Sequence, residues 1–171
     1  MQLGAAQPAL KAAGVETLAI INTPVERARL YFVHRPTPVT LLADPDCRTH
    51  AAYGVLRIGF IEPGDGPPQW PTRTTMEEFQ SVRISPGEEL SGPTQPMLAN
   101  DVLNQKDGFE LTAVDREIFA THGTQLVGHF LIDRDGVVRW THSEARDSAA
   151  DLCRFPSVAE LVAATRILSG R

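Results

Sequence analysis

Two cysteines, Cys47 and Cys153, are the only thiols in the chain and its candidates for nucleophilic or redox chemistry. A thiol reacts as the thiolate, which the amides and the dipole at a helix N-terminus stabilise. The Asp-Pro-Asp segment directly before Cys47 predicts the start of a short helix, running from about residue 47 to residue 53. Cys47 is therefore the candidate for a catalytic thiol, although the carboxylates of Asp44 and Asp46 oppose a thiolate there.

A packed, unreactive thiol is the alternative interpretation of both cysteines, and it is the one that we favour. Cys153 stands beside Arg154 in a predicted loop, with no feature that would activate it. A disulfide between the two cysteines would require Cα atoms within about 7 Å of each other, and a cytoplasmic setting disfavours it.

Five histidines raise the question of a metal site. If Asp135-Gly136 is a two-residue turn, His129 and His142 face each other across a hairpin. Structural zinc sites usually have four ligands, and the sequence places no carboxylate or thiolate to complete one. We therefore expect a solvated or hydrogen-bonded imidazole pair and no metal. The carboxylates of Asp133 and Asp135 fit turn chemistry.

Other chemical signatures are missing from the sequence. It contains no phosphate-binding loop, no Gly-x-Ser-x-Gly and no Rossmann fingerprint, so we predict no cofactor. The formal charge of −5 disfavours a nucleic-acid partner. No apolar run approaches the roughly 20 residues of a membrane span. The first residues lack the basic and apolar regions of a signal peptide, so we expect the cytoplasm.

The element that organises the chain is a predicted β-hairpin over residues 128–144, GHFLIDRDGVVRWTHSE. Two β-prone runs flank an Asp-Gly pair, which is a strong hairpin signal. The apolar residues of this hairpin are nearly continuous, which indicates that both of its faces are covered by other layers. We expect Phe130, Ile132 and Val138 to be mostly buried.

The first third of the chain predicts helices that alternate with strands. A strand over residues 17–22, TLAIIN, is followed by a helix that Thr23 should cap, with Glu26 three residues on. A second strand follows at residues 39–42. This alternation predicts an α/β architecture, in which Leu18, Ile20 and Leu41 should be buried.

The remainder is predicted as an irregular insertion followed by two helices. Residues 61–110 form the insertion, since seven of the 13 prolines lie between Pro63 and Pro96. One short helix after Thr75 is expected within it. Thr112 and Ser157 should cap the two later helices. A chain of 171 residues predicts one domain, residues 1–171.

This order of elements, with two motifs, resembles the C-terminal part of thioredoxin-like proteins. It is most similar to the alkyl hydroperoxide reductase / thiol-specific antioxidant family, the peroxiredoxin-like redoxins. One motif is LADPD at residues 42–46 with AYGV at residues 52–55, and the other is GHFLIDRDGVVR at residues 128–139. The resemblance implies a thioredoxin-like mixed sheet flanked by helices. It also implies antioxidant chemistry on a small-molecule peroxide or a disulfide, a protein or low-molecular-weight thiol reductant, and the option of a homodimer.

The resemblance does not extend to the family's reactive cysteine. That cysteine follows a central strand, and both would precede Met1, so we expect this chain to be N-terminally truncated relative to the family. Val127 also stands where peroxiredoxins often carry Arg. Without the central strand, the strands near residues 17–22 and 128–132 either pair directly or each keep an unpaired edge. Two function classes remain: a thiol-dependent oxidoreductase whose active site lies upstream, and a non-catalytic thioredoxin-fold binding module.

Overall fold

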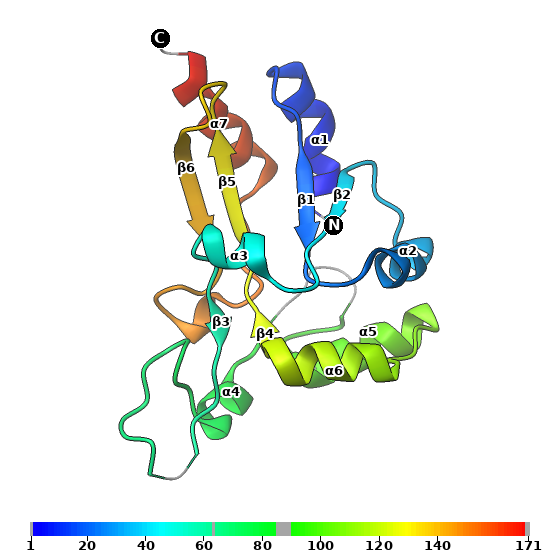
Figure 1. The fold of residues 1–171 in the computed structure, drawn as a ribbon, viewed down its shortest axis with the longest axis vertical. Helices are drawn as coiled ribbons and strands as arrows, with labels where there is room; N and C mark the ends of the chain where they lie inside the picture. The colour runs from blue at the N-terminus through cyan, green and yellow to red at the C-terminus, as the bar shows by residue number, and fades with distance from the viewer. Residues whose placement is uncertain (1, 63, 85–89, 170–171) are drawn as a thin grey trace. The chain divides into compact units, whose positions relative to one another are not determined.

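The computed structural model describes residues 2–62, 64–84 and 90–169, which form two compact units (Figure 1). Unit 1 comprises Met1–Thr49, Gly128–Ser143 and Phe155–Arg171. Unit 2 comprises His50–Val127 and Glu144–Arg154, and it contains the whole predicted insertion, residues 61–110. The predicted α/β class is confirmed, because both units combine helices with short strands.

Unit 1 holds the elements predicted at the two ends of the chain. They are α1 (Gln2–Ala12), β1 (Leu18–Ile21), α2 (Val25–His34), β2 (Thr40–Ala43), the start of α3 (Arg48–Ala52), β5 (Gly128–Ile132), β6 (Val138–Ser143) and α7 (Val158–Ser169). Strands β1 and β2 pair in parallel, with Leu18 opposite Thr40. Strands β5 and β6 form the predicted antiparallel hairpin.

The core of unit 1 lies between its strands and two helices. Helices α1 and α7 pack against each other, and Figure 1 shows both behind the strands. Ala6 and Leu10 of α1 are buried against Leu161 of α7, and Trp140 of β6 packs against this cluster. Side chains alternate along a strand, so His142 lies on the same face of β6 as Trp140.

The opposite faces of these strands are open, and the predicted burial is wrong for four of the six residues named. Leu18 is 51% exposed, Ile20 37%, Ile132 39% and Val138 42%. Leu41 and Phe130 are half-buried. The apolar runs predicted cover on both faces, but within unit 1 the layer of α1 and α7 covers only one.

The strand edges of unit 1 are open as well. Among the described residues, β1 is hydrogen-bonded only to β2, and β5 only to β6, so the sheets have two strands each. Each of β1 and β5 therefore keeps an edge without a backbone partner. This is the second of the two arrangements that the sequence predicts for these strands.

Helix α2 begins differently from the prediction. Its N-cap is Pro24, which has an extended backbone, and no side chain makes a capping hydrogen bond. The predicted cap at Thr23 is therefore wrong. Pro24 precedes the first helical residue instead of occupying it, so the Thr23 hydroxyl is one position too early to cap.

Unit 2 is built around short pairings and three helices. Strands β3 (Arg57–Ile58) and β4 (Thr124–Gln125) are antiparallel. The helices are α4 (Met76–Ser81), α5 (Pro96–Asp107) and α6 (Ala113–His122), with a 3₁₀ turn, η2, at Ala149–Asp151. Thr75 and Thr112 cap α4 and α6, as predicted. The buried core contains Ile58, Phe79, Val82, Ile84, Ala99, Leu126, Ala145 and Leu152.

None of the helices among the described residues combines the length and the apolar character that crossing a bilayer requires.

Candidate functional site

Cys47 occupies the turn between β2 and α3 in unit 1. It is half-buried, its backbone is left-handed with φ 53°, and its amide donates to the Asp44 carbonyl at 3.0 Å. The helix predicted after it is confirmed as α3, which has five residues.

The amides that could stabilise a thiolate at the start of α3 already have an anionic partner. The buried carboxylate of Asp44 accepts hydrogen bonds from Arg48 N at 2.9 Å and Thr49 N at 2.8 Å. The helix-start amides thus stabilise the Asp44 anion, which also opposes a second negative charge nearby. This geometry supports the packed, unreactive interpretation of Cys47.

Cys153 lies in unit 2, where a buried glutamate holds the surrounding backbone. Glu144 accepts hydrogen bonds from Cys153 N at 2.7 Å and Val127 N at 2.9 Å, and its own amide donates to the Val127 carbonyl at 2.8 Å. Burial and the Glu144 carboxylate raise the pKa of the Cys153 thiol to about 11. Cys153 is therefore protonated near neutral pH, which supports its interpretation as a passive thiol.

Both cysteines are free thiols, and they belong to different units. For Cys153, burial and the Glu144 carboxylate favour the neutral thiol.

The histidine pair does form, as the sequence predicts. His129 stands opposite His142 in the β5–β6 register, and the ring centroids are 5.6 Å apart in an edge-to-face arrangement. The predicted solvation or hydrogen bonding is wrong for the Nδ1 atoms: both are buried, and neither has a hydrogen-bond partner. The physical reason is aromatic packing, since His142 stacks on Trp140 and His129 lies against Phe155.

Burial lowers the pKa of His129, and the charge of His142 lowers it further. A metal would need more ligands than this pair supplies. Among the residues that the structure describes, no cluster of three or more His, Cys, Asp or Glu side chains is arranged to hold a metal ion.

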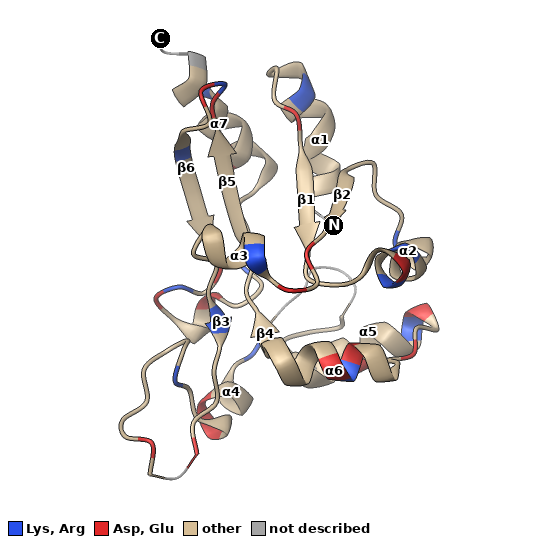
Figure 2. Ribbon diagram, in the orientation of Figure 1, with Lys and Arg blue, Asp and Glu red and all other residues tan. Residues whose placement is uncertain are grey.

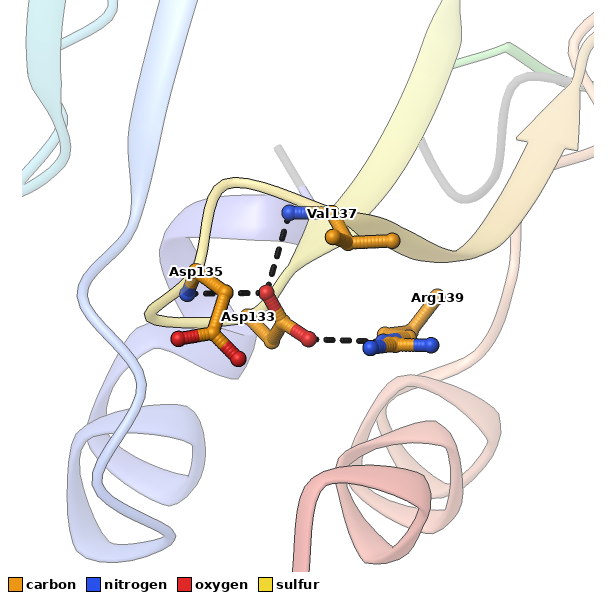
Figure 3. Close-up of polar contacts among 4 residues, drawn as sticks. All are labelled: Asp133, Asp135, Val137 and Arg139. Atoms are coloured by element: carbon orange, nitrogen blue, oxygen red, sulfur yellow. Dashed lines mark hydrogen bonds and ion pairs between the residues drawn. The ribbon is translucent and has the colours of Figure 1, made fainter.

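The Asp133 carboxylate at the hairpin turn accepts hydrogen bonds from backbone amides, which is the turn chemistry that the sequence predicts (Figure 3). Asp133 Oδ1 accepts from Asp135 N and from Val137 N, each at 2.9 Å, and Oδ2 accepts from Arg139 Nε at 2.6 Å. The Val137 hydrogen bond and the Arg139 side chain lower the pKa of Asp133. The carboxylate is thus committed to the turn and is a poor candidate for acid–base catalysis.

The turn is not the two-residue Asp135-Gly136 turn that was the condition for the histidine pairing. Asp133 N donates to the Val137 carbonyl at 2.9 Å, and the register shifts after Leu131, so that Ile132 faces Val138. This bulge adds one residue to β6, Arg139, whose guanidinium reaches the Asp133 carboxylate.

Charge is absent from β5, the strand that leads into this turn, and from the parallel pair β1–β2, whereas β6 carries Arg139. Figure 2 shows β1, β2 and β5 without a single Lys, Arg, Asp or Glu, in agreement with their sequences LAII, TLLA and GHFLI. Apolar side chains of these strands, such as Leu18, Ile20 and Ile132, are consequently exposed, and sequence reasoning missed this because it assigned them to a buried core.

Compared with protein-family models, with curated proteins and with solved structures, the chain has no significant match. The resemblance to peroxiredoxin-like redoxins therefore stays a prediction, and the geometry of the site has to carry the argument about function.

Proposed function

We propose that this chain is a thioredoxin-like, peroxiredoxin-like thiol-dependent oxidoreductase, and that neither Cys47 nor Cys153 is its catalytic thiol. The observation that carries the proposal is the arrangement of unit 1: a parallel pair, β1–β2, with α2 on β2, and a hairpin, β5–β6, with α7 on β6 and α1 on α7. The open edges of β1 and β5 are those expected if one further strand completes a thioredoxin-like mixed sheet.

The chemistry of such a protein explains why another thiol is needed. A thiolate attacks one oxygen of a peroxide, the O–O bond breaks, and a sulfenic acid and water or an alcohol result. A protein or low-molecular-weight thiol then condenses with the sulfenic acid, releasing water, and further thiol reduces the disulfide. With a pKa of about 11, Cys153 has roughly one thiolate in ten thousand molecules at pH 7.

The test is a peroxidase and disulfide-reductase assay with a thiol reductant on two versions of the protein. Residues 1–171 alone should show no activity above that of free cysteine. A version extended by about 30 residues encoded upstream, enough for a strand, a turn and the first turn of a helix, should be active. Its activity should survive Cys47→Ser and disappear when a cysteine of the extension is replaced.

Two results would contradict the proposal. Activity of residues 1–171 that is lost on Cys47→Ser would make Cys47 the catalytic thiol. An extended version that folds well and remains inactive would remove the support for oxidoreductase function.

A non-catalytic thioredoxin-fold binding module is the second candidate, and the same open edges favour it. An extended peptide can add a strand to an exposed sheet edge and gain affinity from backbone hydrogen bonds. A stop codon directly upstream of Met1, together with an inactive protein, would favour this module over the enzyme.

A further inference from the structure

The histidine pair lies between the β5–β6 hairpin and the segment that begins α7. His129 is 6.1 Å from the Phe155 ring, three residues before α7 begins at Val158, and His142 is 6.4 Å from Trp140. Trp140 in turn packs against the α1–α7 core. The two imidazoles therefore form part of the packing that joins hairpin and helix.

Neutral imidazoles suit this position, and imidazolium ions do not. A protonated imidazole donates from both ring nitrogens, but each Nδ1 here is buried without an acceptor. A buried charged donor without a partner is strongly unfavourable. A second positive charge with ring centroids 5.6 Å apart would also repel the first.

The surrounding elements carry one carboxylate that interacts with the pair, together with several cations. Glu160 of α7 interacts electrostatically with His142, but it is exposed and its carboxylate already accepts from Ser157 N at 2.8 Å and Ser157 Oγ at 2.7 Å. The N-terminus of α7 carries a partial positive charge, which opposes imidazolium. The other charged residues on the described parts of the packed elements are Lys11 of α1, Arg139 of β6 and Arg166 of α7.

We propose that His129, packed against His142, is the pH-sensitive part of a latch: as a neutral ring it holds the start of α7 against the hairpin, and its protonation at acid pH releases that contact. The direction follows from linkage. The pKa of His129 is lowered in the packed state, so the open state binds more protons as pH falls below about 6.5, and the packed state is progressively lost.

Amide hydrogen exchange at the start of α7 measures this opening directly. The amides of Glu160 and Leu161 are suitable reporters, because they donate to Ser157 Oγ at 3.2 Å and to the Ser157 carbonyl at 3.0 Å. Exchange is recorded from pH 7.5 to pH 5 and corrected for the intrinsic rate. The opening constant should rise by up to about tenfold per pH unit where His129 is neutral in the packed state and protonated in the open state.

Substitutions test whether the pH dependence of amide exchange comes from His129 and His142. His142→Gln should reduce the pH dependence, and His129→Phe combined with His142→Gln should abolish it. His34→Gln is the matched control, because it removes an exposed imidazole from α2 and should keep the wild-type pH dependence.

The proposal is overturned if the wild-type chain has equal corrected protection at pH 5 and pH 7.5. It is also overturned if the double variant keeps the full pH dependence. Should the variants fail to fold, the wild-type exchange profile and the imidazole titration followed by NMR still decide the matter, since a His129 midpoint at or above 6.5 excludes the latch.

Discussion

Glu144→Gln is the substitution that tests the architecture of unit 2 most directly. The carboxylate accepts two backbone hydrogen bonds, from Val127 N and Cys153 N, in a buried setting. Glutamine preserves the shape but replaces one acceptor oxygen with an NH₂ group, which faces a backbone donor. One charge-assisted bond is lost, leaving an amide unpaired, and the other becomes a weaker neutral bond.

The expected loss is about 2–4 kcal/mol in the free energy of unfolding, since a hydrogen bond to a charged group contributes about 1.5–3 kcal/mol. For a chain of this size that corresponds to a decrease of roughly 5–12 °C in Tm. Urea and thermal unfolding measure both quantities. Glu117→Gln on the exposed surface of α6 is the control, and it should change stability by less than about 0.5 kcal/mol.

The pKa of the Cys153 thiol is a second readout, which separates the loss of the Glu144 charge from a general loss of packing. Because Glu144 is the second cause of the raised pKa of Cys153, after burial, Glu144→Gln should lower that pKa yet leave it above the ordinary value. The rate of iodoacetamide alkylation against pH reports it in a Cys47→Ser background. Unchanged stability together with an unchanged alkylation profile would refute the structural role assigned to Glu144.

Three further predictions concern unit 1. The Val137 hydrogen bond and Arg139 lower the pKa of Asp133, so the stability that this carboxylate contributes is complete above its ordinary pKa and is lost as pH falls through the folded value. Asp133→Asn should therefore flatten the pH dependence of urea unfolding below about pH 4. An unchanged pH dependence would count against this role of Asp133. Stopped-flow oxidation of Cys47 by hydrogen peroxide should be no faster than that of free cysteine, and a rate far above this would reverse the assignment. Residues 1–171 should unfold at lower temperature than the version extended by about 30 residues, because an added strand would give the open edges of β1 and β5 backbone hydrogen bonds and cover exposed apolar side chains. Cooperative unfolding of the shorter version at an ordinary mesophilic temperature, with no gain on extension, would contradict this.

Local features were predictable because they depend on neighbours in sequence. Ser157 and Glu160 form the reciprocal contacts of a capping box, and Thr112 does the same with Asp115. Helix α5 was missed although its signals are present: Pro96 stands at its first turn, and Gly108 ends it in a left-handed conformation. The proline-rich composition of the surrounding segment outweighed those signals in the prediction.

Features that depend on tertiary packing were not predictable. Leu18 and Ile132 are apolar whether or not a second layer covers them, so their sequence could not distinguish a covered face from an open one. The pairing of His129 with His142 was predicted from a two-residue turn, and the structure reaches the same register through a longer turn and the bulge at Arg139. Their unpartnered Nδ1 atoms follow from Phe155 and Trp140. The raised pKa of Cys153 likewise depends on burial and on Glu144, which its immediate sequence neighbours do not reveal.

The division of the chain between the units has a consequence for biosynthesis. Unit 1 is assembled from three separate stretches, and the core residue Leu10 of α1 can be buried only after Leu161 has been translated. At about 5–20 residues per second, the ribosome needs on the order of ten seconds to make the intervening segment. During that interval β1 and β2 emerge as short, uncharged apolar segments, which are the kind of nascent chain that chaperones bind. Yield in the cell should therefore depend on chaperone supply more than the stability of the finished chain would suggest.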